Sequence, residues 1–176
     1  MDIEVYESTT AELDAELLVV YAAIYADAPY NETPEDVAEF AAVWPRIRSE
    51  PGFRLVVARV DGVLVGMAEG YVLRPDCGWW PEGVAAEVAR EWITDGVGRS
   101  FGVDELGIVP AWRGRGVGRR LHAALLAGRR ESRAVLWARV DAPVAQAVYA
   151  GWGYRAVARV DKSNGRSYDV LCLDRG

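Results

Sequence analysis

The segment Val109-Pro110-Ala111-Trp112-Arg113-Gly114-Arg115-Gly116-Val117-Gly118-Arg119 joins a predicted strand to the start of a predicted helix. The first turn of a helix carries unpaired N–H groups and the positive end of the helix dipole, and both attract phosphates. Glycines at 114, 116 and 118 remove the Cβ atoms that would hold a ligand away, and they let successive N–H groups point into one concavity. The segment therefore predicts a phosphate-binding loop; the alternative is a glycine-rich helix entry on an arginine-rich surface.

The flanking sequence predicts a mixed α/β fold. Alternating or β-rich runs predict strands at 3–6, 54–60, 63–73, 101–109, 135–140, 154–160 and 167–173. Asp61-Gly62 and Asn164-Gly165 predict the turns of two hairpins. Because helix 117–130 lies between strands 101–109 and 135–140, we expect a largely antiparallel sheet with one parallel crossover.

Three further helices are expected from start signals and from apolar residues at helical spacing. Thr9 and Glu12 form a capping-box pattern before an apolar face that reaches Ile24. Thr33 and Pro34 begin the next helix, which Pro45 should end or kink. A short helix is expected over 143–150.

Length and composition favour a single soluble domain over residues 1–176, with 74–100 as an insertion that forms part of the acceptor side. The net charge of −6 argues against a nucleic-acid partner. The longest apolar run, 17–26, is about half of the ~20 residues that a membrane span needs, so we expect no membrane partner. The acidic N-terminus lacks a secretory pattern, and Cys77 and Cys172 share no metal or disulfide spacing, so we expect a cytoplasmic protein with free thiols.

The pattern Val-Pro-x-x-Arg-Gly-x-Gly-x-Gly matches neither GxGxxG nor GxxxxGK[ST]. It resembles the pyrophosphate motif of the GNAT superfamily of N-acetyltransferases, and the resemblance extends from about Val103 to Tyr154. It implies a six- to seven-stranded sheet flanked by about four helices, with a V-shaped splay between the central parallel strands. It also implies acetyl-CoA as co-substrate and, because members often dimerise, a homodimer.

The same resemblance assigns the cofactor residues. The pyrophosphate would lie on the backbone of the loop, and the pantetheine arm would bond to the strand before it. The residues so assigned are Leu106, Gly107, Ile108, Arg113, Gly114, Arg115, Gly116, Val117, Gly118 and Arg119. A lone strand glycine such as Gly107 marks a bulge or a close approach by another backbone, and the alternative is a glycine that makes room for an aromatic neighbour.

Two residues are candidates for acid and base catalysis. Tyr149, in a segment that resembles the family's closing helix, is the proposed general acid, because a phenol can protonate a leaving thiolate without ionising first. Packing of that helix on the sheet is its alternative role. Glu105 is the first candidate for the base that deprotonates an ammonium, with a solvated or ion-paired strand residue as the equally weighted alternative. Asp104, Glu69 and Asp95 remain open as bases.

The acceptor is expected to be a small cationic amine, because the chain is acidic and its insertion carries aromatic residues. Trp79 and Trp80 are candidates for the acceptor wall, with core or interface packing as the alternative. His122 is the only histidine and has no supporting nucleophile motif, so neither triad catalysis nor a histidine-based metal site is expected. The alternative functions are acetylation of a protein N-terminus or lysine, and a non-catalytic CoA-binding module.

Overall fold

The computed structural model describes residues 1–74, 79, 98–162 and 165–176. Most of the predicted insertion, 74–100, lies outside these residues. The chain divides into two compact units, one formed by 1–71 with 103–129 and the other by 72–102 with 130–176. The expectation of a single domain over the whole chain stays a prediction.

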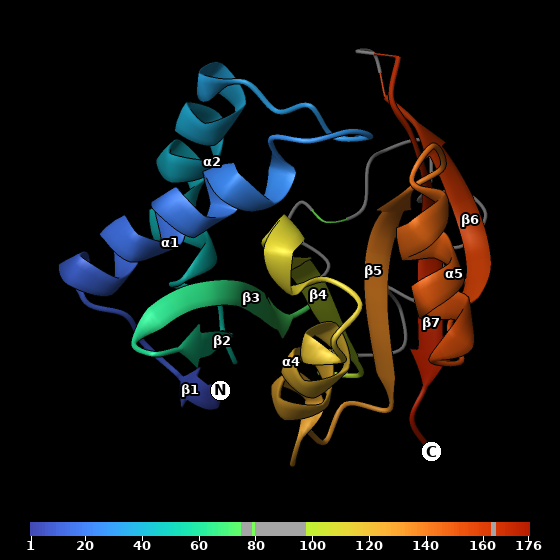
Figure 1. The fold of residues 1–176 in the computed structure, drawn as a ribbon. Coiled ribbons are helices and arrows are strands. Elements are labelled where there is room, and N and C mark those ends of the chain that lie inside the picture. Colours follow the sequence, from blue (N-terminus) through green and yellow to red (C-terminus); the bar gives the residue numbers. More distant parts are fainter. Residues whose placement is uncertain (75–78, 80–97, 163–164) are drawn as a thin grey trace. The chain divides into compact units, whose positions relative to one another are not determined.

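The seven strands form one mixed sheet in the order β1-β2-β3-β4-β5-β7-β6 (Figure 1). The pairs β1–β2, β2–β3, β5–β7 and β6–β7 are antiparallel. By contrast, β4 and β5 pair in parallel over Ser100–Gly102 and Arg133–Val135. Within the described residues, the sheet and four helices confirm the mixed α/β fold, with β4 and β5 as the parallel pair. The strands are β1 (Asp2–Tyr6), β2 (Arg54–Val60), β3 (Val63–Val72), β4 (Ser100–Ile108), β5 (Arg133–Arg139), β6 (Arg155–Asp161) and β7 (Ser167–Asp174).

The predicted hairpin at Asp61-Gly62 is confirmed. Both residues have positive φ, 50° and 79°, as the tight turn of a twisted hairpin requires. The turn brings β2 and β3 into antiparallel register, with Val60 opposite Val63. For the second hairpin, β6 and β7 pair as expected, while Asn164 lies outside the described residues.

The first helix, α1 (Ala11–Tyr25), begins one residue later than the capping-box pattern predicts. Its N-cap is Thr10, whose side chain accepts from the Leu13 amide at 3.3 Å. The prediction of Thr9 as the cap is wrong. Its hydroxyl oxygen is buried and has no hydrogen-bond partner among the described residues. Two adjacent threonines offer the same chemistry, and the register of the helix on the sheet decides between them.

The second helix, α2 (Pro34–Ile47), starts where the sequence predicts. Thr33 caps it, and a capping box forms with Asp36. The helix passes through Pro45 and ends two residues later, at Ile47. Aromatic stacking joins the two helices, because Tyr21 lies parallel to Phe40 with ring centroids 4.0 Å apart.

The helix after the phosphate loop, α4 (Val117–Leu126), is shorter than the predicted 117–130. The chain leaves the helical path at Ala127, and Gly128 has a φ of 67°. The Arg54 guanidinium donates to the carbonyls of Leu125 at 3.2 Å and Ala127 at 2.6 Å, so a side chain from β2 holds the last turn. The remaining helix, α5 (Pro143–Gly151), agrees with the prediction of 143–150 to one residue.

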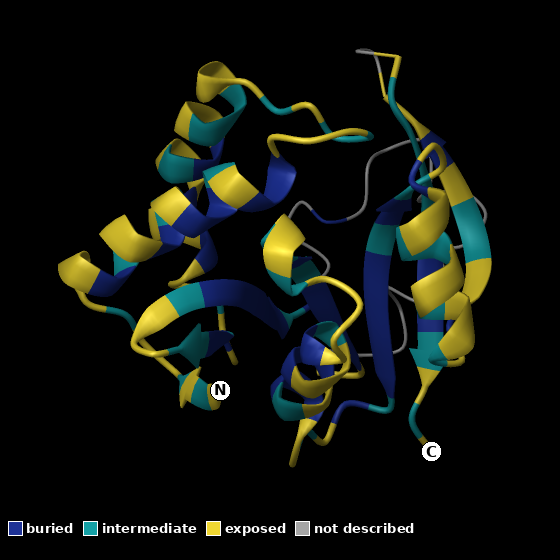
Figure 2. Ribbon diagram, in the orientation of Figure 1, coloured by how far each residue is buried: buried dark blue, intermediate teal, exposed yellow. Residues whose placement is uncertain are grey.

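Each unit contains buried apolar side chains, and Figure 2 shows dark blue segments on the strands and on α1, α2 and α4, whereas α5 has no buried residue. In the first unit the fully buried side chains include Leu17, Ile24, Met67 and Leu121. In the second they include Phe101, which lies on β4. Burying each such side chain contributes about 1.5–3 kcal/mol. Among the described residues, no helix combines the length and apolar character needed to cross a membrane.

Candidate active site

The glycine-rich loop follows β4 through a short 3-10 helix, η1 (Pro110–Trp112), and ends at the first residue of α4. Gly114 and Gly116 have φ values of 72° and 76°, in the left-handed region that favours glycine. A Cβ added at either position would meet nothing within 4 Å, so the outer side of the loop is open. The glycines therefore serve the loop's backbone shape and its accessibility, and they do not make room for packing.

The backbone amides of this loop are the strongest sign of an anion site. Within the part of the chain that the structure describes, the amides of residues 114–119 have no hydrogen-bond acceptor. The first amide to be paired is that of Arg120, which donates to the Gly116 carbonyl at 3.2 Å. Gly116 is the N-cap and brings no side-chain cap. The start of α4 thus presents a row of uncapped donors at the positive end of its dipole, which suits a diphosphate.

The arginines around the loop fall into two groups. Arg113 is engaged with the protein itself: its Nε donates to the Ile108 carbonyl at 3.0 Å, and its Nη2 donates to the Ile24 carbonyl at 2.7 Å. Arg115 lies over the Trp112 ring, 4.8 Å from the ring centroid, and Arg119 is exposed. Arg113 therefore holds the loop against the end of α1, and Arg115 and Arg119 supply exposed positive charge.

Gly107 allows α1 to approach β4 closely. A Cβ at this position would lie 2.4 Å from Ile24 Cγ2 and 3.3 Å from the Tyr25 hydroxyl oxygen. No side chain fits there without moving the helix. The nearest atoms are side-chain atoms of an isoleucine and a tyrosine of α1 and not backbone atoms, so these contacts favour the alternative, a glycine that makes room for neighbouring side chains. A role for Gly107 in the predicted splay stays a prediction.

Glu105, the predicted base, lies on β4 two residues before that contact and is partly exposed. The Tyr25 hydroxyl donates a hydrogen bond to its Oε2. Burial, followed by the charge of Asp104, raises the pKa of Glu105 to about 8, and the hydrogen bond from Tyr25 offsets part of that rise. A carboxyl group that titrates near neutral pH is suited to accept a proton from an ammonium.

Further carboxyl groups lie near Glu105 and form, with it, an acidic cluster of Glu32, Glu69, Asp104 and Glu105. Glu69 on β3 is completely buried, and no N–H or O–H donor among the described residues reaches either of its oxygens. Burial raises the pKa of Glu69 well above its usual value, and the neighbouring charges of Asp104 and Glu105 add to the effect. The charge of Glu32 likewise raises the pKa of Glu105. Burial and mutual repulsion therefore disfavour the charged forms of Glu69 and Glu105.

The other sequence-predicted residues lie in the second unit. Tyr149 is half-buried on α5, and its ring packs edge-on against Trp152 and Tyr154, with centroids 5.7 Å away in each case. Gln146 attaches the same helix to β5, because its side-chain amide donates to the carbonyls of Ala138 and Arg139 at 3.3 and 3.1 Å.

Of the two tryptophans predicted to line the acceptor site, the structure describes only Trp79. Trp79 is buried and packs edge-on against Trp137, with ring centroids 6.4 Å apart. Its ring also lies 2.9 Å from where a Cβ on Gly102 would be. These contacts favour the packing alternative for Trp79. Trp80 lies outside the described residues, as does Asp95, one of the alternative bases.

Sequence reasoning missed Tyr25 and Glu32 as members of the site. Tyr25 follows Tyr21 at helical spacing and reads as a core residue, and its ring does pack against Tyr21, with centroids 4.7 Å apart. Only its hydroxyl group distinguishes it, and the partner of that hydroxyl lies 80 residues further along the chain. The acidic sequence around Glu32 gives no sign that the carboxyl group will lie near β4.

No group of three or more metal-ligating side chains occurs among the residues that the structure describes. His122 is buried on α4. Cys172 is a free, buried thiol whose pKa is raised to about 11, mainly by burial, and Cys77 lies outside the described residues.

Solved structures resemble this fold over the whole chain. An aminoglycoside 6′-acetyltransferase type Ii is 17% identical with a TM-score of 0.69, covering 100% of this chain and 98% of its own. The ribosomal-protein-S18-alanine N-acetyltransferase of Escherichia coli is 12% identical with a TM-score of 0.66, covering 99% and 95%. The PaiA N-acetyltransferase of Thermoplasma acidophilum, solved in complex with coenzyme A, is 13% identical with a TM-score of 0.62, covering 99% of each chain.

At these identities the structural likeness establishes the fold alone. No curated protein matches the sequence significantly. The family model for the acetyltransferase (GNAT) family matches residues 17–154, which include the phosphate loop, β4 with Glu105, and α5 with Tyr149. The chain therefore belongs to the acetyltransferase (GNAT) family and is an acyl-CoA-dependent N-acetyltransferase.

Proposed function

We propose that this protein transfers the acetyl group of acetyl-CoA directly to a primary amine of a small cationic molecule. The observation that carries the proposal is the row of backbone amides at 114–119, which have no acceptor within the described residues. Their donors and the dipole of α4 suit the diphosphate of acetyl-CoA, and the exposed Arg115 and Arg119 add positive charge. The backbone of Leu106, Gly107 and Ile108 would hold the pantetheine arm.

The chemistry requires one proton acceptor and one proton donor. Glu105 takes a proton from the ammonium group of the acceptor, and the freed nitrogen lone pair attacks the thioester carbonyl carbon. A carbon–nitrogen bond forms, and the carbon–sulfur bond breaks as the tetrahedral intermediate collapses. Tyr149 donates its phenolic proton to the departing thiolate, and the second proton, which the nitrogen loses as it becomes an amide, returns to the tyrosine through solvent. No covalent acyl-enzyme forms in this scheme.

The acidic cluster supports a cationic acceptor. Glu69 has no hydrogen-bond donor among the described residues, and the charge of Arg46 offsets only part of the rise in its pKa. An ammonium group brought next to the cluster would relieve the repulsion among its carboxyl groups and favour their charged forms. Aminoglycosides, amino sugars and polyamines carry such groups, and one solved structure of similar fold is an aminoglycoside acetyltransferase.

A second candidate acceptor is a protein N-terminus or lysine, and one solved structure of similar fold is a ribosomal-protein-alanine acetyltransferase. A non-catalytic CoA-binding module is the third candidate. Homodimer formation and a cytoplasmic location, both expected from the sequence and its resemblance, stay predictions.

Release of the CoA thiol from acetyl-CoA in the presence of a panel of amines separates these candidates. We expect turnover with aminoglycosides or polyamines, which carry several ammonium groups, and little with neutral amino-acid amides. Turnover with peptides alone would favour the protein acetyltransferase. No turnover with any amine, together with a rise in melting temperature on adding acetyl-CoA, would favour the binding module.

A further inference from the structure

The last turn of α1 contacts both the phosphate loop and the proposed base. Its residue Ile24 accepts a hydrogen bond from Arg113 at 2.7 Å, and its side chain fills the space above Gly107. The next residue, Tyr25, donates to Glu105. Because these contacts hold the last two residues of α1, they place the Tyr25 hydroxyl against β4.

The tyrosine ring is itself held in place. It packs against Tyr21 and edge-on against Tyr30, with centroids 4.7 and 5.0 Å away. The carbonyl of Tyr25 accepts from the Glu32 amide at 2.9 Å, which closes the chain segment that follows the helix. Ring, backbone and hydroxyl are therefore all engaged, so the hydroxyl cannot turn away from Glu105 without moving its neighbours.

The groups that act on Glu105 are otherwise mostly acidic. Asp104 on β4 and Glu32 after α1 each disfavour its charged form, and the carboxyl of Glu69 on β3 and the Tyr21 hydroxyl on α1 are also within electrostatic reach. The Tyr25 hydroxyl is the only group that favours the carboxylate among those acting on Glu105 in the described part of the chain.

We propose that Tyr25 is a positioning residue, whose hydroxyl holds the Glu105 carboxylate in one orientation and in the deprotonated form that accepts the proton of the amine. This inference rests on the proposed function. It assigns to α1, a helix outside the phosphate motif, control over the pH at which the enzyme becomes active. Arg113 links that same turn to the phosphate loop, so the placement of the cofactor loop and the state of the base depend on one helix end.

Replacing Tyr25 with phenylalanine tests the proposal. The change removes one oxygen atom and keeps the ring contacts. Because a hydrogen bond from Tyr25 favours the charged carboxylate, its loss should raise the pKa of Glu105 by about one unit, which lowers the deprotonated fraction about tenfold near pH 7. We expect the acid limb of the kcat/KM profile to move up by the same amount, with the KM for acetyl-CoA unchanged.

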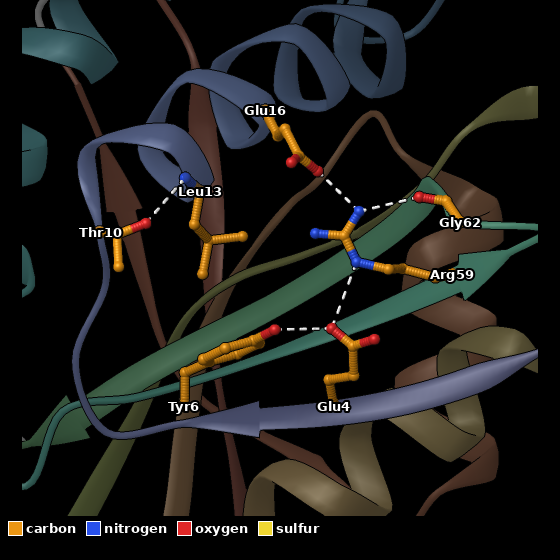
Figure 3. A network of polar contacts seen from close by, with 7 residues as sticks. All are labelled: Glu4, Tyr6, Thr10, Leu13, Glu16, Arg59 and Gly62. Carbon is orange, nitrogen blue, oxygen red and sulfur yellow. Dashed lines mark hydrogen bonds and ion pairs between the residues drawn. The ribbon is translucent and has the colours of Figure 1, made fainter.

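The matched control is Tyr6→Phe. The Tyr6 hydroxyl donates to Glu4 Oε2 at 2.6 Å on β1, so this variant removes the same atom from the same kind of bond (Figure 3). It should leave the titration of Glu105 and the pH profile as in the wild type. A Tyr25→Phe profile that coincides with that of Tyr6→Phe would overturn the proposal.

A second measurement does not depend on activity. The side-chain carboxyl carbon of Glu105, assigned by its absence from the ¹³C spectrum of Glu105→Gln, should titrate near pH 8 in the wild type and about one unit higher in Tyr25→Phe. In the wild type, the ¹³Cζ resonance of Tyr25 should shift with the same pH midpoint as Glu105. In Glu105→Gln, where Tyr25 itself is unchanged, this pH-dependent shift should be absent. If the wild type is active but the titrations of Glu105 and Tyr25 are not linked in this way, only the role of Tyr25 is refuted. If the titrations are linked but the protein has no activity, only the proposed function is refuted.

Discussion

Glu105→Gln should lower kcat/KM by about 10²- to 10⁴-fold at pH 8, the usual contribution of a positioned general base. The amide cannot take the proton of the ammonium group, and so the concentration of the attacking free amine falls. In the wild type, kcat/KM should rise with pH around a midpoint of about 8, where half of the Glu105 carboxyl groups are deprotonated. The measurement is a pH profile of CoA release for both proteins, in which the variant should lack this limb.

Two further variants make that result specific. Glu16→Gln removes an equal charge from an exposed carboxylate on α1 that pairs with Arg59 at 2.6 Å, and it should retain activity (Figure 3). Asp104→Asn removes a charge that raises the pKa of Glu105, so the acid limb should move to lower pH. If Asp104→Asn lost the acid limb of the kcat/KM profile and Glu105→Gln kept it, Asp104 would be the base. That result would contradict our assignment.

Tyr149→Phe should lower kcat by about 10²-fold, with little change in the affinity for acetyl-CoA. The variant keeps the ring that packs against Trp152 and Tyr154 but cannot protonate the departing thiolate. Steady-state kinetics would give kcat, and calorimetry would give the affinity.

Tyr168→Phe is the matched control for this change, because it removes the same atom from a tyrosine of β7 in the same unit. It should turn over like the wild type. If Tyr149→Phe also turned over at the wild-type rate, Tyr149 would be left with the packing role alone.

The sequence predicts those parts of the fold that depend on local chemistry. Asp61-Gly62 can adopt the left-handed angles of a tight turn, and both residues do so. Thr33 and Pro34 start α2, because the cap and the proline act within one helical turn. Gly114 and Gly116 of the phosphate loop likewise have positive φ angles, which glycine adopts without a steric penalty.

Features that depend on distant contacts could not be predicted. The choice of Thr10 over Thr9 as the cap depends on how α1 packs. The last turn of α4 is held by Arg54, which is more than 70 positions away in the chain, although Gly128 with a φ of 67° is also a local signal for the end of the helix. Burial of Glu69 beside Asp104, and the bond from Tyr25 to Glu105, likewise arise only when separate segments meet. Sequence patterns identified the candidate base, and its environment came from tertiary structure.

Isothermal titration of the protein with acetyl-CoA, and separately with acetylpantetheine, which lacks the diphosphate and nucleotide, tests the central claim most directly. Several charge-assisted hydrogen bonds from the loop amides, each contributing about 1.5–3 kcal/mol, should make acetyl-CoA bind at least about 100-fold more tightly. Equal affinities for the two ligands, or no heat of binding with acetyl-CoA, would contradict a diphosphate site at the start of α4.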